Sequence, residues 1–384
     1  MPKNKRPVPR KAAPAPLEDN EVLAQSLAAL AVDLAEQAHS KQLDAATVRA
    51  KEEDFNKLVR NALRKHNDEV LYGAIEHARD ADVAAYQYLR SHIEEAAATV
   101  LLRKEGAPAM EVTAFAVPLF VQSFGGLKEA EGFQDSEAFV ELVASFKHAG
   151  LESPQAKVVM VSHAYDADEA ARISYSDLHE MGRDAAAAMS DKKLVAAPAL
   201  ERSMVGWAPC AFGPVDKAVE LRFLLGFALK RADDAFYLPP SGEAAEEAYY
   251  DQRMARYRAW TAKAGPLVQR CLAADAGSLQ VHFLYQDLFF GAREQGMEEL
   301  NMLRLISELG AALEQHASPA RAIVGPADVD DMMVLRVSLV DASGSELAHA
   351  DKPLDLGADL QAEVDDVCDA LATLGIHEVA VALR

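Results

Sequence analysis

Near the N-terminus, apolar residues recur at the spacing of an amphipathic helix. A leucine occurs at every third or fourth position, which places one apolar stripe on a helical face. The stripe consists of Leu23, Leu27, Leu30 and Leu34. The same kind of spacing predicts three more helices, at Ala45–Lys65, Glu69–His77 and Ala81–Arg103. We therefore expect residues 17–105 to form helical hairpins without strands.

The next part of the chain alternates between strand and helix patterns. Val112–Phe120 has the composition of a strand, and Ser136–His148 is an amphipathic helix. Lys157–Val161 is a short apolar run of the kind that is buried on both faces of a sheet. This order of strand, helix and strand predicts a right-handed, parallel βαβ unit within residues 106–215.

The remaining residues, 216–384, repeat this alternation. We expect a strand, a long helix, a strand and a strong helix, in that order, at Val219–Leu229, Glu243–Ala274, Ser278–Phe290 and Met297–His316. The chain then closes with a β-hairpin, a helix and a strand, at Met333–Val340, Glu346–His349, Asp359–Leu374 and His377–Leu383. The pattern as a whole predicts an α/β or α+β protein, in which N-terminal helical hairpins precede βαβ-type units with one or more mixed sheets.

The distribution of charge separates the N-terminal tail from the rest of the chain. The 384 residues include 39 Lys+Arg and 60 Asp+Glu, which gives a net charge of −21. Such a surface repels nucleic acid and anionic lipid. Residues 1–16, by contrast, are rich in Pro and Ala and carry five basic residues without an acid. We expect a disordered basic tail that either contacts an anionic partner, such as nucleic acid or an acidic protein surface, or has no partner at all.

Cysteine content and hydropathy point to the cytoplasm. The three cysteines, Cys210, Cys271 and Cys368, lie too far apart for a CxxC site, and an odd, sparse set fits a reducing compartment. No apolar run reaches the length of a membrane span, so we expect no membrane partner. The glycine-rich loops that bind nucleotides and dinucleotides do not occur, and we expect no cofactor.

The best chemical candidates follow the expected strand at Lys157–Val161. His163, Asp166 and Asp168 come after its carboxyl end, where open α/β sheets place their ligands. A histidine with carboxylates suits a divalent ion or acid–base chemistry, as in a metal-assisted hydrolase or a small-molecule transferase. The alternative is structural: the two aspartates begin and cap the next helix, and His163 is a solvated loop residue.

Two further groups carry weaker chemical signals. Cys210 lies between prolines and aromatic residues, either as a thiol nucleophile or as a buried structural cysteine. Asp328, Asp330 and Asp331 precede the expected strand at Met333 and form either a cation site or a solvated loop that protects a sheet edge.

The long helix at Glu243–Ala274 carries an unusual aromatic group. Its aromatic residues alternate with arginines, in an arrangement that suits either base stacking or packing against the core and a partner. The aromatic residues are Tyr249, Tyr250, Tyr257 and Trp260, and the arginines are Arg253, Arg256 and Arg258. The acidity of the chain favours packing.

Three segments together resemble a known family. They are Phe55–Asp68, Ala84–Ala97 and the strand Val112–Phe120, which ends in Val-Pro-Leu-Phe. In order and spacing, residues 20–165 resemble a proteobacterial family of uncharacterised proteins, domain of unknown function 2863. The resemblance implies a bacterial, cytoplasmic protein and supplies no catalytic residue.

Our leading hypothesis from the sequence is a non-catalytic interaction or regulatory protein. It rests on the lack of a recognisable catalytic constellation and on helical hairpins that present apolar stripes. Self-association through the leucine stripe at residues 23–34 is the partner contact that this hypothesis favours.

Overall fold

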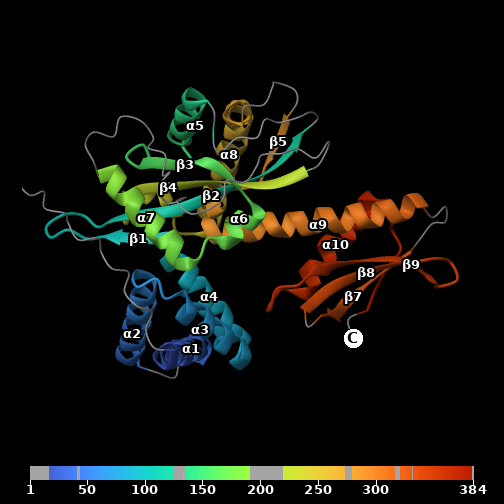
Figure 1. The fold of residues 1–384 in the computed structure, drawn as a ribbon, viewed down its shortest axis with the longest axis horizontal. Helices are drawn as coiled ribbons and strands as arrows, with labels where there is room; N and C mark the ends of the chain where they lie inside the picture. Colours follow the sequence, from blue (N-terminus) through green and yellow to red (C-terminus); the bar gives the residue numbers. More distant parts are fainter. Residues whose placement is uncertain are drawn as a thin grey trace, which may run out of the picture. The chain divides into compact units, whose positions relative to one another are not determined.

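A computed structural model describes residues 17–40, 44–123, 133, 135–190, 219–272, 279–315, 321–330 and 332–382. The chain divides into two compact units, one up to Ile93 and the other from Glu94 onward. The first unit is helical, and the second contains two sheets with interleaved helices (Figure 1). This arrangement confirms the predicted mixed α/β class. None of the described helices combines the length and the apolar composition that crossing a membrane requires.

The first unit consists of helices that pack on one another. They are α1 (Leu17–Ser40), α2 (Ala45–Arg64), α3 (Asp68–Ala81) and the beginning of α4 (Val83–Ala98). α1 contacts both α2 and α3. The Asp44 carboxylate caps α2 by accepting hydrogen bonds from the first free backbone N–H groups of the helix. Two leucines of the α1 stripe, Leu27 and Leu34, are buried, whereas Leu23 is partly exposed.

The first sheet is built around one long central strand. Its strands are β1 (Thr99–Leu102), β2 (Met110–Ser123), β3 (Lys157–Asp166), β4 (Val219–Arg231), β5 (Leu279–Phe283) and β6 (Asp287–Leu288). The order is β1-β2-β4-β3, and every pairing in the sheet is antiparallel. β2 pairs with β4 along one edge and with β1, β6 and β5 along the other.

Two expectations for this region need correction. Thr99–Leu102 forms a strand and not the last turn of the preceding helix, because Thr99 and Val100 pair with Thr113 and Val112 of β2. β2 and β3 run in the same direction with helix α5 (Ser136–His148) between them, as predicted, but they are not neighbours. β4, from much later in the chain, lies between them and pairs with both.

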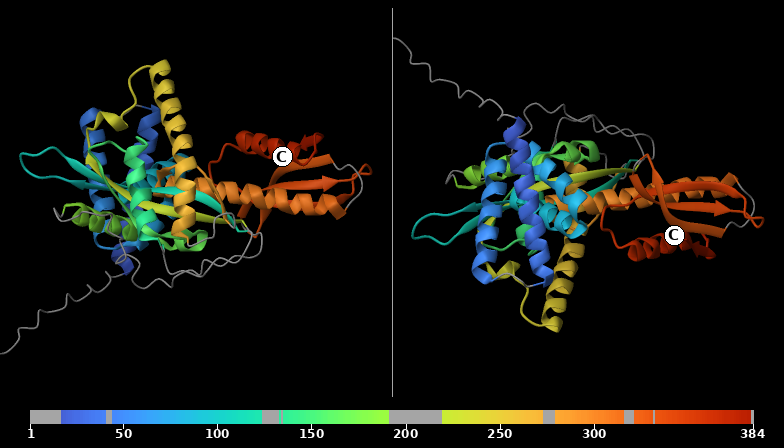
Figure 2. Two further views of the ribbon diagram at one scale, coloured as in Figure 1. Left: turned by 90° about the horizontal axis from the view of Figure 1, so that it is seen from above. Right: turned by 90° about the horizontal axis from the view of Figure 1, so that it is seen from below.

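Helices cover both faces of the first sheet. α5 and α8 (Glu243–Cys271) lie side by side on one face (Figure 2). The other face contacts α6 (Ala167–Arg172), α7 (Tyr175–Ser190) and the first part of α9 (Phe289–Gln315). The glycine in the middle of β4, Gly226, leaves room for the ring of Phe115 on the adjacent strand: a Cβ at this position would lie 2.4 Å from that ring.

The second sheet carries its core on one face. Its strands are β7 (Arg321–Val329), β8 (Met332–Val340), β9 (Glu346–Pro353) and β10 (Val379–Val381), in the order β10-β7-β8-β9. β10 pairs parallel with β7, and the other pairs are antiparallel. α10 (Leu360–Thr373) and the second part of α9 contribute apolar residues to the core of this sheet.

Two elements in this half differ from the expected ones. The strand expected at Ser278–Phe290 is interrupted after Phe283. Its last two residues, Phe289 and Phe290, are instead buried residues in the first turn of α9. The sequence does not predict β7, because several of its residues are typical of a polar loop. It forms a strand by pairing with β8.

Candidate functional site

His163 lies within a strand and not in a solvated loop. β3 continues to Asp166, and its register against β4 shifts between Met160 and Ala164, which marks a bulge. The imidazole is 1% exposed, and its Nε2 lies 2.9 Å from Oε2 of Glu169. The histidine therefore belongs to the folded interior at the edge of the sheet, where it contacts the first turn of α6.

The carboxylate of Asp166 caps the next helix, as the structural alternative predicted. Asp166 accepts a hydrogen bond from the backbone N–H of Glu169, and Glu169 accepts one from the backbone N–H of Asp166, which forms a capping box. The Asp166 carboxylate also lies 3.9 Å from Arg222, a buried arginine that pairs with Glu220. Asp168 is exposed. These contacts give His163, Asp166 and Glu169 structural partners.

The weaker candidates are not brought together. Asp328 lies on β7 opposite Met333, and Asp330 occupies the turn to β8 with φ of 50°. Asp331 and Cys210 lie outside the described residues. In the described part of the chain, no group of three or more His, Cys, Asp or Glu side chains is placed to hold a metal ion.

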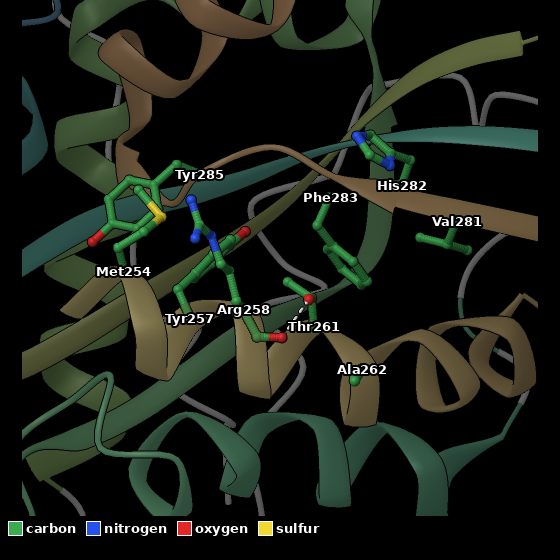
Figure 3. Close-up of a pocket in the computed structure, with 9 residues that line it drawn as sticks. All are labelled: Met254, Tyr257, Arg258, Thr261, Ala262, Val281, His282, Phe283 and Tyr285. Atoms are coloured by element: carbon green, nitrogen blue, oxygen red, sulfur yellow. Dashed lines mark hydrogen bonds between the residues drawn. The ribbon is translucent and has the colours of Figure 1, made fainter. Parts of the chain in front are cut away.

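A groove lies between α8 and β5 in the described part of the chain. Its volume is about 450 Å³, within the range of ligand sites. One wall comes from α8 and the other from β5 and the segment after it. The lining residues are Met254, Tyr257, Arg258, Thr261, Ala262, Val281, His282, Phe283 and Tyr285 (Figure 3). We call this feature the α8–β5 groove.

The two walls are joined by specific contacts. The Tyr257 hydroxyl donates a hydrogen bond to the carbonyl of Leu284, and the Tyr257 ring lies 4.8 Å from that of Tyr285. Phe283 contacts Trp260 of α8, with 5.3 Å between the ring centroids. Aromatic side chains from both walls therefore form the floor of the α8–β5 groove and fix the distance between helix and strand.

A buried polar network holds the segment that follows β5. The Glu152 carboxylate accepts hydrogen bonds from the hydroxyl of Tyr237 at 2.7 Å and from the side-chain amide of Gln286 at 3.2 Å. The Tyr237 hydroxyl accepts one from the backbone N–H of Ser153 at 3.0 Å. Gln286 adjoins Tyr285, so this network anchors the end of the groove wall to the loop between α5 and β3.

The charge of the α8–β5 groove is positive. Figure 3 shows the side chain of Arg258 rising from α8 between Tyr285 and Phe283. No acidic residue is among the lining residues, and Arg258 makes no ion pair with any described residue. His282 contributes its ring from the opposite face of β5. The groove thus combines aromatic walls with a cation that is available to an anionic ligand.

We expect Glu152 to make stability depend on pH. Burial raises the pKa of Glu152 above its ordinary value, although the hydrogen bond from Tyr237 and the charge of Lys230 act in the opposite direction. The folded protein therefore favours the protonated carboxyl. Its contribution to stability is complete below the pKa of 4.5 that the group has in the unfolded chain, and it is lost as the pH rises through the raised pKa of the folded protein. Denaturant titrations should show wild type gaining stability relative to Glu152→Gln as pH is lowered from about 8 to about 4.5.

The matched control for this prediction is Glu141→Gln, which removes an exposed carboxyl from α5. Its difference from wild type should stay nearly constant over the same pH range. A difference between wild type and Glu152→Gln that does not change with pH would contradict the raised pKa.

Half of the groove has a signal in the sequence. On α8 the lining residues Met254, Tyr257, Arg258 and Thr261 follow helical spacing, and the sequence shows arginines alternating with aromatic residues there. Tyr257 and Trp260 are buried in the core, whereas Tyr250 is exposed, so packing and not base stacking explains most of this group. The β5 wall has no such signal, because its position depends on pairing with β2 far upstream in the chain.

No family model, curated protein or solved structure matches this chain. The resemblance of residues 20–165 to domain of unknown function 2863 therefore stays a prediction, and the functional argument rests on the groove itself.

Proposed function

We propose that this chain is a non-catalytic interaction protein that binds a segment of a partner protein in the α8–β5 groove. The observation that carries the proposal is the presence, in one open groove, of aromatic walls and an arginine without a counter-ion among the described residues. Protein interfaces are enriched in tyrosine, phenylalanine, methionine and arginine, and all four residue types line this groove.

The lining chemistry favours binding over catalysis. Acid–base or nucleophilic catalysis needs a proton acceptor that is usually oriented by a carboxylate. His282 is the histidine among the lining residues, and no described carboxylate is hydrogen-bonded to it. The hydroxyl of Tyr257 is engaged by the Leu284 carbonyl, and that of Thr261 by the carbonyl of Arg258. Burial raises the pKa of Tyr257 well above its ordinary value, so this phenol stays neutral and donates a hydrogen bond.

We expect charge reversal at Arg258 to remove partner binding. A library of short random peptides is selected against the full chain, and the enriched peptides are titrated against wild type and Arg258→Glu. Binding to wild type should be at least about tenfold tighter, because the variant replaces attraction of an anionic group by repulsion. Arg258 is exposed, so the fold of the variant should be unchanged.

The matched control is Lys263→Glu, a charge reversal at an exposed position of the same helix that does not line the groove. It should bind the enriched peptides as wild type does. The proposal is overturned if selection yields no peptide whose binding depends on Arg258, or if Lys263→Glu weakens binding to the same degree as Arg258→Glu.

We infer that binding takes place in the cytoplasm. Both cysteines in the described part of the chain, Cys271 and Cys368, are free thiols, as expected in a reducing compartment. Burial raises the pKa of the Cys271 thiol to about 12, which keeps it protonated and unreactive. Residues 1–16, the basic tail for which an anionic partner is expected, lie outside the described residues.

A further inference from the structure

We propose that the partner segment binds by adding a strand to the free edge of β5, and that it carries an acidic and an apolar residue two positions apart. This inference rests on the proposed function and defines the kind of partner that the α8–β5 groove accepts. It is supported by three features of the described residues: the unpaired edge of β5, the position of α8 beside that edge, and the charge of Arg258.

The first feature is the edge of β5. Among the described strands, β5 pairs only with β2. Backbone bonds in an antiparallel pair alternate, so successive residues direct their N–H and C=O groups to opposite sides. The N–H of Leu284 donates to the carbonyl of Pro118, which places the backbone groups of His282 and Gln280 on the β2 side. The backbone groups of Val281 and Phe283 consequently point to the free edge.

One hydrogen bond supports this assignment independently. The side-chain amide of Gln269 on α8 donates to the carbonyl of Leu279 at 2.7 Å. Leu279 has the same phase as Val281 and Phe283, so its carbonyl faces away from β2, where a helical side chain can reach it. Gln269 satisfies the edge at this end, and Val281 and Phe283 remain able to pair with an added strand.

The second feature is α8 itself, which turns the edge into a groove. Val281 and Phe283 direct their side chains toward α8, and Figure 3 shows Phe283 pointing toward Thr261. A strand added beside β5 places alternate side chains on the same face, over Met254 and Tyr257 of the helix. An apolar residue at one of these positions covers the aromatic floor of the groove.

The third feature is charge, which determines the residue two positions from the apolar one. In an extended strand these two side chains lie on the same face, about 7 Å apart. Arg258 reaches this part of the groove from α8 and has no described counter-ion. A carboxylate there gains a charge-assisted hydrogen bond, whereas a basic residue is repelled. The preferred pattern is therefore acidic–x–apolar in an extended segment.

The test uses a fluorescein-labelled peptide of sequence Ser-Thr-Glu-Thr-Leu-Thr-Ser, with fluorescence polarisation as the readout. We expect saturable binding to wild type that weakens about tenfold when the glutamate of the peptide is replaced by glutamine. With the protein variant Arg258→Gln, the same change in the peptide should have no further effect on affinity. N-methylation of one residue that pairs with β5 should weaken binding by a similar factor, whereas N-methylation of its neighbour, whose N–H faces solvent, should not.

A variant of the protein tests the same edge from the other side. Val281→Pro removes an outward N–H and part of the valine packing against α8, but no bond of the ladder to β2. Most of the thermal stability should therefore be preserved, while peptide binding is lost. Val281→Thr keeps the N–H and is the matched control. Its affinity for the peptide should equal that of wild type.

Three results would each overturn strand addition. Peptides whose binding depends on Arg258 but not on any backbone N–H would leave the proposed function intact and eliminate this binding mode. A wild type that dimerises in sedimentation, and that Val281→Pro converts to a monomer, would show that a second copy occupies the edge. Failure of all selected peptides to respond to Arg258 substitutions would overturn the proposed function as well.

Discussion

Replacing both Glu298 and Glu363 by glutamine is expected to lower the free energy of unfolding of the second sheet by about 3–5 kcal/mol. Replacing the lysine in the same variant should recover most of this loss. The triple variant that also carries Lys352→Met is expected to differ from wild type by about 1 kcal/mol, because no charge is then left without a counter-ion and methionine is apolar and similar in length. The contrast follows from the position of a single buried ammonium group.

Lys352 lies on β9 with its side chain fully buried, opposite Leu335 in the register of the second sheet. Its ammonium group pairs with Glu298 of α9 and with Glu363 of α10. Burial lowers the pKa of Lys352, but the two hydrogen-bonded carboxylates raise it more, so the lysine stays charged. Without them, a buried charge has no counter-ion, and the two helices lose their shared attachment to the sheet.

The matched control is Asp351→Asn, which breaks a more exposed pair with Arg336 on the adjacent positions of the same strands. Its effect on the denaturation midpoint should be much smaller. Hydrogen exchange of the amides of β8 and β9 locates the loss within the second sheet. Equal destabilisation by the triple variant and by the double glutamine variant would contradict the stranded-charge explanation.

Local patterns in the sequence were sufficient for most helices. Ser136–His148 has an N-terminal aspartate cap and four apolar residues on one face, and α5 has the predicted bounds. Helical hydrogen bonds connect residues four apart, so the information lies within the segment itself. The beginning of α9 at Phe289 was missed, because adjacent buried phenylalanines fit a strand as well as a helix.

Strand partners were not predictable, because they depend on residues far apart in the chain. β4 lies between β2 and β3 and pairs with both. No local pattern in the sequence specifies this central position. β7 contains Gly325, Pro326 and Asp328, which are typical of a loop. It is a strand because β8 on one side and β10 on the other supply its backbone partners.

The chemistry of the site was only partly visible in the sequence. The sequence places His163 three residues before Asp166 and correctly predicts that Asp166 caps a helix, but it indicates neither the burial of the histidine nor the bulge in β3. In the sequence, Arg258 is one of several arginines that alternate with aromatic residues. Its separation from every described carboxylate is a three-dimensional property, and so is its place in the α8–β5 groove.

Trp260→Ala is expected to lower the free energy of unfolding of the first sheet by about 3–5 kcal/mol. The indole projects from α8, is 1% exposed, and packs between α5 and β5. It packs against Phe146 with 4.7 Å between the ring centroids and against Phe283 at 5.3 Å. Its Nε1–H donates to the hydroxyl of Ser145 at 2.7 Å. Truncation removes all of these contacts and leaves a cavity beneath the groove.

Denaturant titration followed by circular dichroism measures this loss. Tyr250→Ala is the matched control, because it removes an aromatic ring from the same helix at an exposed position. Its unfolding midpoint should remain close to that of wild type. Trp260→Phe should lie between the two, since phenylalanine keeps most of the ring packing but cannot donate to Ser145. A midpoint for Trp260→Ala equal to that of Tyr250→Ala would contradict the assigned core role.

The effects at Trp260 and at Lys352 should also be independent of each other. α9 contacts both sheets, but it packs on the face of the first sheet opposite the one that α8 and Trp260 cover. Combining Trp260→Phe with Glu363→Gln should therefore give the sum of the two single losses within about 0.5 kcal/mol, as for sites without shared partners. A larger deviation would mean that α9 couples the packing of the two cores.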